Sequence, residues 1–174
     1  MPHTQQASSR SGQDFRGMYT AIITPFTGPK ASEIDEDAYR QLLLLQAEGG
    51  ASGVVVSGTT GEGPTLSDDE FDKLIRLSAA EAGELMQIIA GTGTSNTATT
   101  IAKSLRAQDN GAHALLIAPP SYSKPSQHGL LAHFKAIAES VELPVILYNV
   151  PGRTAVNIEV ETMAELSAHP RIVG

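Results

Sequence analysis

Apolar and polar positions form a pattern that recurs roughly every 30 residues from Gly17 onward. Each repeat begins with a short apolar run, continues through a polar loop, and ends in a segment with the periodicity of an amphipathic helix. This alternation predicts parallel strands joined by helices. The predicted strands are Tyr19–Thr24, Gly53–Val56, Gln87–Gly91, His113–Ala118, Val145–Tyr148 and Arg171–Gly174.

The predicted helices begin after residues whose side chains can accept hydrogen bonds from the first turn. Asp35 or a near neighbour precedes the first helix. Ser67 and Glu70 form a capping-box pattern before the second helix, and Ser126 can cap the fourth. The buried faces predicted by the periodicity are Ala38, Leu42 and Leu45; Phe71, Leu74, Ile75 and Ser78; Ala98, Ile101, Ala102 and Leu105; and Leu130, Phe134, Ile137, Ala138 and Val141.

Two sheets would suit this array. An open, doubly wound sheet would be complete at this length, whereas a (β/α)8 barrel of about 250 residues would be about two-thirds present. The first turn after a strand lacks the G-x-G-x-x-G dinucleotide fingerprint, and Gly58–Gly63 lacks the Gly-Lys-Ser/Thr ending of a P-loop. Polar and small residues instead follow several strands, as in barrel enzymes. They are Thr24-Pro25, Thr59-Thr60, Gly91-Thr92-Gly93, Tyr122 and Tyr148–Arg153.

We therefore predict an α/β fold of the (β/α)8 TIM-barrel type, with about the first five and a half βα units in this chain. The most informative loop is Gly58-Thr59-Thr60-Gly61, which follows a strand that is apolar on both faces. Its hydroxyls and backbone N–H groups suit a carboxylate or carbonyl oxygen. A plain turn with solvent-facing threonines is the alternative.

Composition narrows the class of partner. Twelve basic and nineteen acidic residues give a net charge of −7, which argues against nucleic acid and anionic membranes. The sequence has no cysteine, and no apolar run approaches the ~18 residues of a membrane span. Residues 1–16 are polar and aperiodic, so we expect a disordered tail before a domain at 17–174. No secretion leader opens the chain, so we expect a cytoplasmic protein.

Four motifs occur in one order along the chain. They are Gly58-Thr59-Thr60-Gly61-Glu62, Ala90-Gly91-Thr92-Gly93, Pro119-Pro120-x-Tyr122-x-Lys124-Pro125-Ser126 and Tyr148-Asn149-Val150-Pro151-Gly152-Arg153-Thr154. Together they resemble the dihydrodipicolinate synthase / N-acetylneuraminate lyase family of pyruvate-dependent aldolases. The resemblance covers Gly17 to Gly174 and implies a (β/α)8 barrel that usually assembles as a homo-oligomer, a dimer or a tetramer of tight dimers.

The resemblance also implies roles. In the family, pyruvate forms a Schiff base with a barrel lysine and then attacks an aldehyde, without metal or organic cofactor. Thr60 matches the residue that holds the pyruvate carboxylate, and Tyr148 matches the general acid/base. Thr59 and Tyr122 match its partners in a proton relay, with Tyr122 reaching in from the neighbouring subunit. Arg153 matches the group that binds aspartate semialdehyde, and it favours the lysine-biosynthesis branch, since sialic acid lyases usually lack it.

Taken alone, these residues have ordinary alternatives. A tyrosine at a strand end is more often a half-buried packing residue, and Arg153 alone would be a solvated loop charge. His128 and His133 lie five residues apart on one predicted helix and do not share a face, so we expect no metal site.

Two departures from the family pattern stand out. The family's Schiff-base lysine follows a Gly-[Ile/Val]-Lys motif that would begin at Gly174, so the nucleophile would lie past the end of this sequence. We expect the 174 residues alone to be inactive, because the predicted elements put Lys73, Lys103, Lys124 and Lys135 on helices or a loop. The family's lysine-inhibition site is also not matched. Asp68, Phe71, Ser95 and Thr99 stand at its positions, so we do not expect that regulation.

Three functions remain open on the sequence. The first is condensation of pyruvate with aspartate semialdehyde in lysine and diaminopimelate biosynthesis. The second keeps the Schiff-base chemistry but acts on another 2-keto acid, as in N-acetylneuraminate or keto-deoxy-gluconate aldolases. The third is a non-catalytic remnant.

Overall fold

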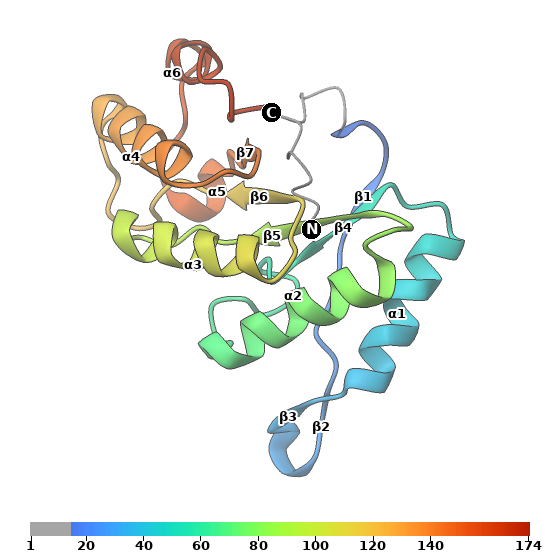
Figure 1. Cartoon of the computed structure of the whole chain (residues 1–174). Helices are drawn as coiled ribbons and strands as arrows, with labels where there is room; N and C mark the ends of the chain where they lie inside the picture. Colours follow the sequence, from blue (N-terminus) through green and yellow to red (C-terminus); the bar gives the residue numbers. More distant parts are fainter. Residues whose placement is uncertain (1–14) are drawn as a thin grey trace, which may run out of the picture.

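The structure, a computed structural model, describes residues 15–174. The disordered tail predicted over residues 1–16 therefore falls almost entirely outside the described residues. Five parallel strands form one sheet, and their order in space follows their order in the chain (Figure 1). The strands are β1 Tyr19–Ala21, β4 Gly53–Val56, β5 Gln87–Gly91, β6 Ala114–Ile117 and β7 Val145–Leu147.

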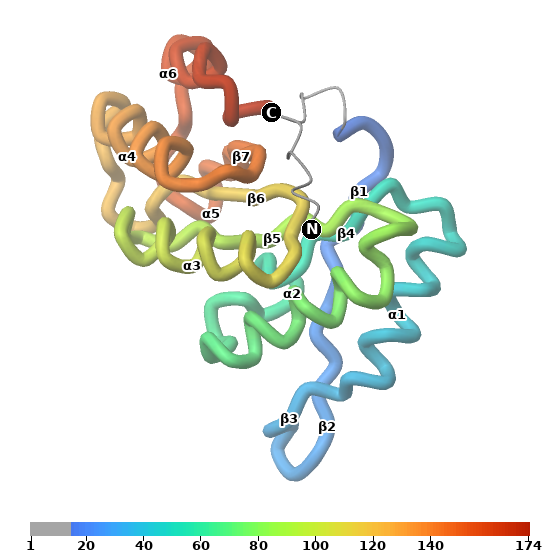
Figure 2. Tube along the Cα trace, in the orientation of Figure 1, coloured from blue at the N-terminus to red at the C-terminus, as the bar shows by residue number. Residues whose placement is uncertain are grey.

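This strand order decides between the two predicted sheets. A doubly wound sheet reverses its strand order and carries helices on both faces. Here the long helices follow one another along one side of the sheet, as right-handed crossovers in a single direction require (Figure 1). The same progression appears in Figure 2, where the colour runs from blue near β1 to red at α6. The barrel-type fold is confirmed, and the doubly wound alternative is wrong.

The predicted sixth strand is present as one bridge. Ile172 pairs in parallel with Val145. The Val145 N–H donates to the Arg171 carbonyl over 2.7 Å, and the Leu147 N–H donates to the Gly174 carbonyl over 2.8 Å. The segment from 171 to 174 therefore continues the sheet beyond β7.

The strands are joined by helices and one hairpin. The antiparallel hairpin of β2 (Phe26–Thr27) and β3 (Glu33–Ile34) encloses the 3-10 turn η2 (Pro29–Ala31) and has no counterpart in the predicted elements. Within residues 15–174, no helix is long and apolar enough to cross a membrane. The helices are α1 Glu36–Glu48, α2 Asp68–Ala82, α3 Thr97–Asp109, α4 Gln127–Ser140, α5 Pro151–Thr154 and α6 Val160–Leu166.

The predicted helix starts are confirmed. Asp35 accepts a hydrogen bond from the Ala38 N–H over 3.0 Å. Ser67 and Glu70 form the reciprocal capping box, and the backbone hydrogen bond to Glu70 holds the pKa of that carboxyl below its usual value. Ser126 accepts from the Gly129 N–H at the start of α4. Local sequence therefore sets where these three loops end and α1, α2 and α4 begin.

The buried faces are predicted correctly for α2 and α4 but not for α1. Every predicted residue of those two faces is buried, whereas α1 buries Tyr39 and Leu43 and leaves Leu45 60% exposed. Four consecutive leucines define no unique face, so an aromatic residue decides the orientation. The Tyr39 hydroxyl lies 2.8 Å from Ser78 Oγ on α2, and burial raises the pKa of Tyr39 to about 12.

The predicted face of α3 is also wrong, for a different reason. Ala98, Ala102 and Leu105 are exposed, and α3 buries Thr100, Ser104 and Ala107 instead. Ser104 donates to Thr92 Oγ1 over 2.9 Å, so the buried hydroxyls have partners in the loop after β5. A pattern that counts only apolar residues as buried cannot find such a face.

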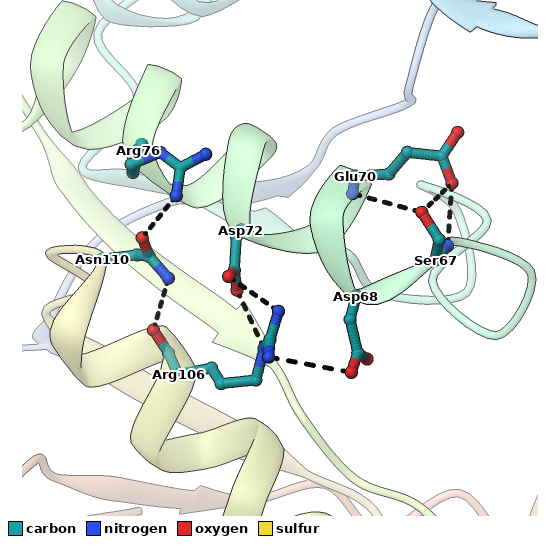
Figure 3. Close-up of polar contacts among 7 residues, drawn as sticks. All are labelled: Ser67, Asp68, Glu70, Asp72, Arg76, Arg106 and Asn110. Atoms are coloured by element: carbon teal, nitrogen blue, oxygen red, sulfur yellow. Dashed lines mark hydrogen bonds and ion pairs between the residues drawn. The ribbon is translucent and has the colours of Figure 1, made fainter.

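Charged side chains connect α2 to α3 on the outer surface (Figure 3). The Arg106 guanidinium donates to both carboxylate oxygens of Asp72, over 3.1 and 2.8 Å, and lies 3.7 Å from Asp68. Asn110 joins the same cluster by accepting from Arg76 over 3.1 Å. A two-pronged arginine–carboxylate pair of this kind fixes the relative orientation of neighbouring helices.

Candidate active site

The candidate site lies along the edge of the sheet where β4, β6 and β7 end. Thr59 and Thr60 follow β4 in a tight turn and are both exposed. The Gly61 and Gly63 N–H groups donate to the Gly58 carbonyl over 3.1 and 3.0 Å. The turn is anchored by the segment that follows β1, because the buried Thr24 hydroxyl donates to the Gly61 carbonyl over 2.7 Å. The threonine pair therefore stands on a fixed support.

Ser57, directly before this turn, has a left-handed backbone with φ of +57°. A Cβ at Gly63 would lie 2.0 Å from the Ser57 carbonyl oxygen, and one at Gly91 would lie 2.7 Å from it. Only glycine fits at either position, since the clashing atom belongs to the backbone. The Ser57 hydroxyl is buried and has no hydrogen-bond partner among the described residues. The ends of β4 and β5 are therefore packed backbone to backbone.

Tyr122 follows β6 on a loop that is held from two sides. Its backbone has φ of +69°, and its side chain is 92% exposed. On one side the Tyr122 N–H donates to the Thr154 carbonyl over 3.2 Å. On the other, the Ser95 hydroxyl contacts the Ser121 carbonyl and hydroxyl over 3.3 and 3.2 Å. The loop holds the Tyr122 side chain exposed to solvent, where its ring can contact another molecule.

Tyr148 and Arg153 both follow β7. The Tyr148 N–H donates to the Ile117 carbonyl over 2.9 Å, which fixes its backbone against β6, and the side chain is 45% exposed. Arg153 lies on α5, where the Arg153 N–H donates to the Val150 carbonyl over 2.9 Å, and it too is exposed. Pro151 at the start of α5 supplies the fixed φ of a first helical turn.

The structure thus brings Thr59, Thr60, Tyr122, Tyr148 and Arg153 to one edge of one sheet. It does not join their side chains, because within residues 15–174 no hydrogen bond links any two of these five. The proton relay implied by the resemblance stays a prediction.

The five lysines of the sequence lie elsewhere. Lys30 belongs to η2, Lys73 to α2, Lys103 to α3 and Lys135 to α4. Lys124 stands on the exposed loop that follows β6. Lys103 is also engaged, with its Nζ 4.6 Å from the centroid of the Phe71 ring. None of them stands at the end of β4 or β7 beside Thr60 and Tyr148.

Sequence reasoning missed the residues that support the site. The Thr154 side chain is 4% exposed, and its hydroxyl lies within hydrogen-bond distance of the Val150 carbonyl before α5 and the Val156 carbonyl after it. Asn149 accepts from the Ile158 N–H over 3.1 Å and donates to Asn157 Oδ1 over 2.8 Å. Both belong to the Tyr148–Thr154 motif, which is the signal that could have found them. Within the described chain, no group of three or more His, Cys, Asp or Glu could hold a metal ion.

A parallel α/β sheet with polar side chains at the carboxyl ends of successive strands defines an enzyme-like scaffold of the barrel class. The chain belongs to the Dihydrodipicolinate synthetase family, whose sequence profile matches residues 14–174. It is 51% identical over 158 residues to the 4-hydroxy-tetrahydrodipicolinate synthase of Xanthomonas campestris pv. campestris, covering 91% of this chain and 52% of that protein. The resemblance seen in the motifs is confirmed.

Solved structures agree. The 4-hydroxy-tetrahydrodipicolinate synthase of Methylacidiphilum fumariolicum SolV matches with a TM-score of 0.86 and 43% identity, over 90% of this chain and 51% of that one. The chloride-inhibited dihydrodipicolinate synthase of Acinetobacter baumannii, solved with pyruvate, matches with a TM-score of 0.87 and 43% identity, over 91% of this chain and 54% of that one. The chain spans about half the length of the relatives it matches.

Proposed function

We propose that the protein carrying this sequence condenses pyruvate with aspartate semialdehyde through a Schiff base. The observation that carries the proposal is the exposure of a threonine pair after β4, and of a tyrosine and an arginine after β7, at the carboxyl ends of one parallel sheet in a chain of this family. Each is a group that the two substrates require. Both substrates carry a carboxylate, and the chemistry between them needs one positioned proton donor and acceptor.

The proposed roles follow from the chemistry of each group. The hydroxyl and N–H group of Thr60 bind the pyruvate carboxylate as donors on a fixed turn. Thr59 and a Tyr122 from the neighbouring subunit relay protons to and from Tyr148. Tyr148 moves the protons as amine adds to ketone, as water leaves, and as the methyl group loses a proton to give an enamine. The enamine carbon then attacks the aldehyde. Arg153 holds the aldehyde's carboxylate, because its planar fork matches two carboxylate oxygens at once.

We further propose that the Schiff-base amine comes from a lysine outside these 174 residues. The placement of Lys30, Lys73, Lys103, Lys124 and Lys135 supports this, since none lies beside Thr60 and Tyr148. The 174-residue chain is then the N-terminal part of the barrel and is inactive alone.

We also propose a homo-oligomer in which Tyr122 enters the site of a neighbouring subunit. The support is a large aromatic side chain that is 92% exposed on a loop held from both sides. Such a residue is well suited to an interface, because its ring adds contact area at little cost in flexibility. The proposal keeps the cytoplasmic location expected above, which suits a reaction between small polar metabolites, and it keeps the absence of lysine inhibition.

The test is a coupled assay of the protein carrying this sequence, with pyruvate and aspartate semialdehyde, followed by borohydride trapping with pyruvate. We expect turnover and one reduced pyruvate adduct on a single lysine. Cleavage of N-acetylneuraminate or keto-deoxy-gluconate without turnover of aspartate semialdehyde would replace the proposal by the related aldolases. An adduct on one of the five lysines named above would contradict the placement of the nucleophile.

A further inference from the structure

Tyr122 and Arg153 lie on loops that follow different strands, yet a single residue, Thr154, links the two loops. Thr154 directly follows Arg153 at the end of α5, and its carbonyl accepts the Tyr122 N–H over 3.2 Å. Its side chain is 4% exposed, in contrast to the exposed side chains on either side of it. Thr154 is therefore the point where the loop after β6 meets the loop after β7.

The buried hydroxyl of Thr154 closes the turn that ends α5. It lies 3.0 Å from the Val156 carbonyl oxygen and 3.2 Å from the Val150 carbonyl oxygen. A threonine hydroxyl carries one proton, so it serves these two acceptors alternately or as a shared donor. Between them Ala155 has a left-handed φ of +61°. A helix of four residues has no stability of its own, so α5 depends on such contacts.

A second set of hydrogen bonds, made by Asn149 and Gln127, holds the same segment. Asn149 bridges to the backbone N–H of Ile158 and the side chain of Asn157. Gln127, at the start of α4, donates to the Asn157 carbonyl over 2.8 Å. The residues from 149 to 158 therefore form a closed loop with Arg153 near its middle and Thr154 as its buried contact.

We propose that Thr154 is a positioning residue for Arg153 and Tyr122 together. Its hydroxyl fixes α5 and so the direction in which Arg153 leaves the backbone, while its carbonyl fixes the backbone of Tyr122. The catalytic consequence rests on the proposed function, but the structural coupling does not. Loss of the hydroxyl frees α5, and the Tyr122 loop loses its fixed acceptor.

The test compares Thr154→Val with Thr154→Ser. Valine keeps the shape and removes the hydroxyl, whereas serine keeps the hydroxyl. In Thr154→Val we expect the Tyr122 amide to exchange its hydrogen about tenfold faster, in line with the loss of one buried hydrogen bond. The reference is the His113 amide, which donates to the Ile88 carbonyl over 2.8 Å inside the sheet and should change less than twofold. Thr154→Ser should restore the exchange rate of Tyr122.

Kinetics of the protein carrying this sequence supply the second readout. In Thr154→Val we expect the KM for aspartate semialdehyde to rise about tenfold, with the KM for pyruvate within twofold of wild type. Thr154→Ser should restore it. If wild type turns over neither substrate, the proposed function fails, and the exchange rates still decide the positioning role.

Unchanged exchange at Tyr122 in Thr154→Val would overturn the inference. Equal acceleration at Tyr122 and His113 would also overturn it, because Thr154 would then act only on global stability. If Thr154→Val does not fold, Asn149→Ala takes its place, since Asn149 is exposed and closes the same loop. That variant must accelerate exchange at Ile158 and at Tyr122. Acceleration at Ile158 alone would contradict the coupling.

Discussion

The two ends of the sheet turn the chain in different ways. At the amino ends, where helices lead into β4 and β6, the left-handed backbone positions are glycines, Gly50 with φ of +81° and Gly111 with φ of +93°. At the carboxyl ends of β4, β6 and β7 the described chain puts side chains in that region instead. These residues are Ser57, Glu62, Tyr122, Lys124 and Ala155.

Left-handed backbone costs a residue with a Cβ about 1–2 kcal/mol, a cost that glycine does not carry. The amino ends therefore use the least costly residue for each turn. The carboxyl ends retain side chains despite the strain, and strained backbone of this kind gathers at functional sites. The comparison indicates that one end of the sheet serves stability and the other serves the site. The following predictions test that division, from the largest expected effect to the smallest.

Two tyrosines give the sharpest contrast. Tyr148 stands at a carboxyl end, and its hydroxyl has no hydrogen-bond partner within residues 15–174. Tyr19 stands at an amino end, where its hydroxyl donates to Gln87 Oε1 over 2.7 Å and burial raises its pKa. We expect Tyr148→Phe to lower kcat by roughly 10²–10⁴, the usual weight of a positioned acid/base, with pyruvate still bound.

The matched control is Tyr19→Phe, which should leave kcat within twofold and lower the free energy of unfolding by about 1 kcal/mol. Steady-state kinetics and urea unfolding measure the two quantities. An unchanged kcat in Tyr148→Phe would return Tyr148 to the role of a packing residue and remove the functional half of the comparison.

Arg153 provides the second test. Arg153→Ala should lower kcat/KM for aspartate semialdehyde at least tenfold, because a lost charge-assisted pair with a bound carboxylate is worth about 2–5 kcal/mol. Pyruvate binding, measured by its KM, should change little. The matched control is Arg76→Ala, since Arg76 lies on α2 away from the site and donates to Asn110 over 3.1 Å (Figure 3). Equal losses for both substrates would mean that Arg153 does not select the aldehyde.

The sequence predicts the repeating architecture well because strand burial and helix caps are local features. β5 has the predicted bounds, and Asp35, Ser67 and Ser126 cap the helices that they were expected to cap. The faces of α1 and α3 could not be read in the same way. One is set by a hydrogen bond from Tyr39 to another helix, and the other buries hydroxyls rather than apolar groups.

The site is predictable only in part. Its motifs indicated which loops carry the chemistry, but a pattern of residue types contains neither backbone angles nor contacts between loops. The support that Thr154 gives to Tyr122 depends on a backbone carbonyl 32 residues away in the chain. The left-handed φ of Ser57 likewise accompanies the close backbone approach of Gly63 and Gly91, which residue type alone does not reveal.

The third test uses His133 and measures how the stability of the fold depends on pH. It is 5% exposed on α4, with Nδ1 2.9 Å from Thr97 Oγ1 and Nε2 buried without a partner among the described residues. Burial lowers the pKa of His133 below its usual value of 6.5. As pH falls through about 6.5, the unfolded chain takes up a proton that the folded chain does not, so stability falls by up to about 1.4 kcal/mol per pH unit.

His133→Gln should flatten this dependence between pH 7 and pH 5, and the matched control is His128→Gln, an exposed histidine on the same helix. Chemical denaturation at several pH values measures the slope. The kcat of both variants at pH 8 should match wild type, since His133 lies in the helix layer. Identical slopes in the two variants would show that His133 is not the titrating group.

The last prediction exchanges alanine and glycine at two positions whose backbone is left-handed. Ala155 follows α5 with φ of +61°, and Gly50 follows α1 with φ of +81° and has no atom within 4 Å of the place that a Cβ would occupy. Ala155→Gly should relieve about 1–2 kcal/mol of strain in the folded chain. Glycine also gives the unfolded chain more conformational freedom, which lowers stability by up to about 1 kcal/mol, so we expect the free energy of unfolding to rise by about 0.5 kcal/mol. Gly50→Ala should lower the free energy of unfolding by a similar amount, with no steric clash to confuse the result.

If the carboxyl end stores strain for the site, Ala155→Gly also raises the KM for aspartate semialdehyde, because the freed loop holds Arg153 less firmly. Gly50→Ala leaves that KM unchanged. A stability gain with no change in KM would mean that the strain at Ala155 is incidental, and the two ends of the sheet would then differ in sequence without differing in purpose.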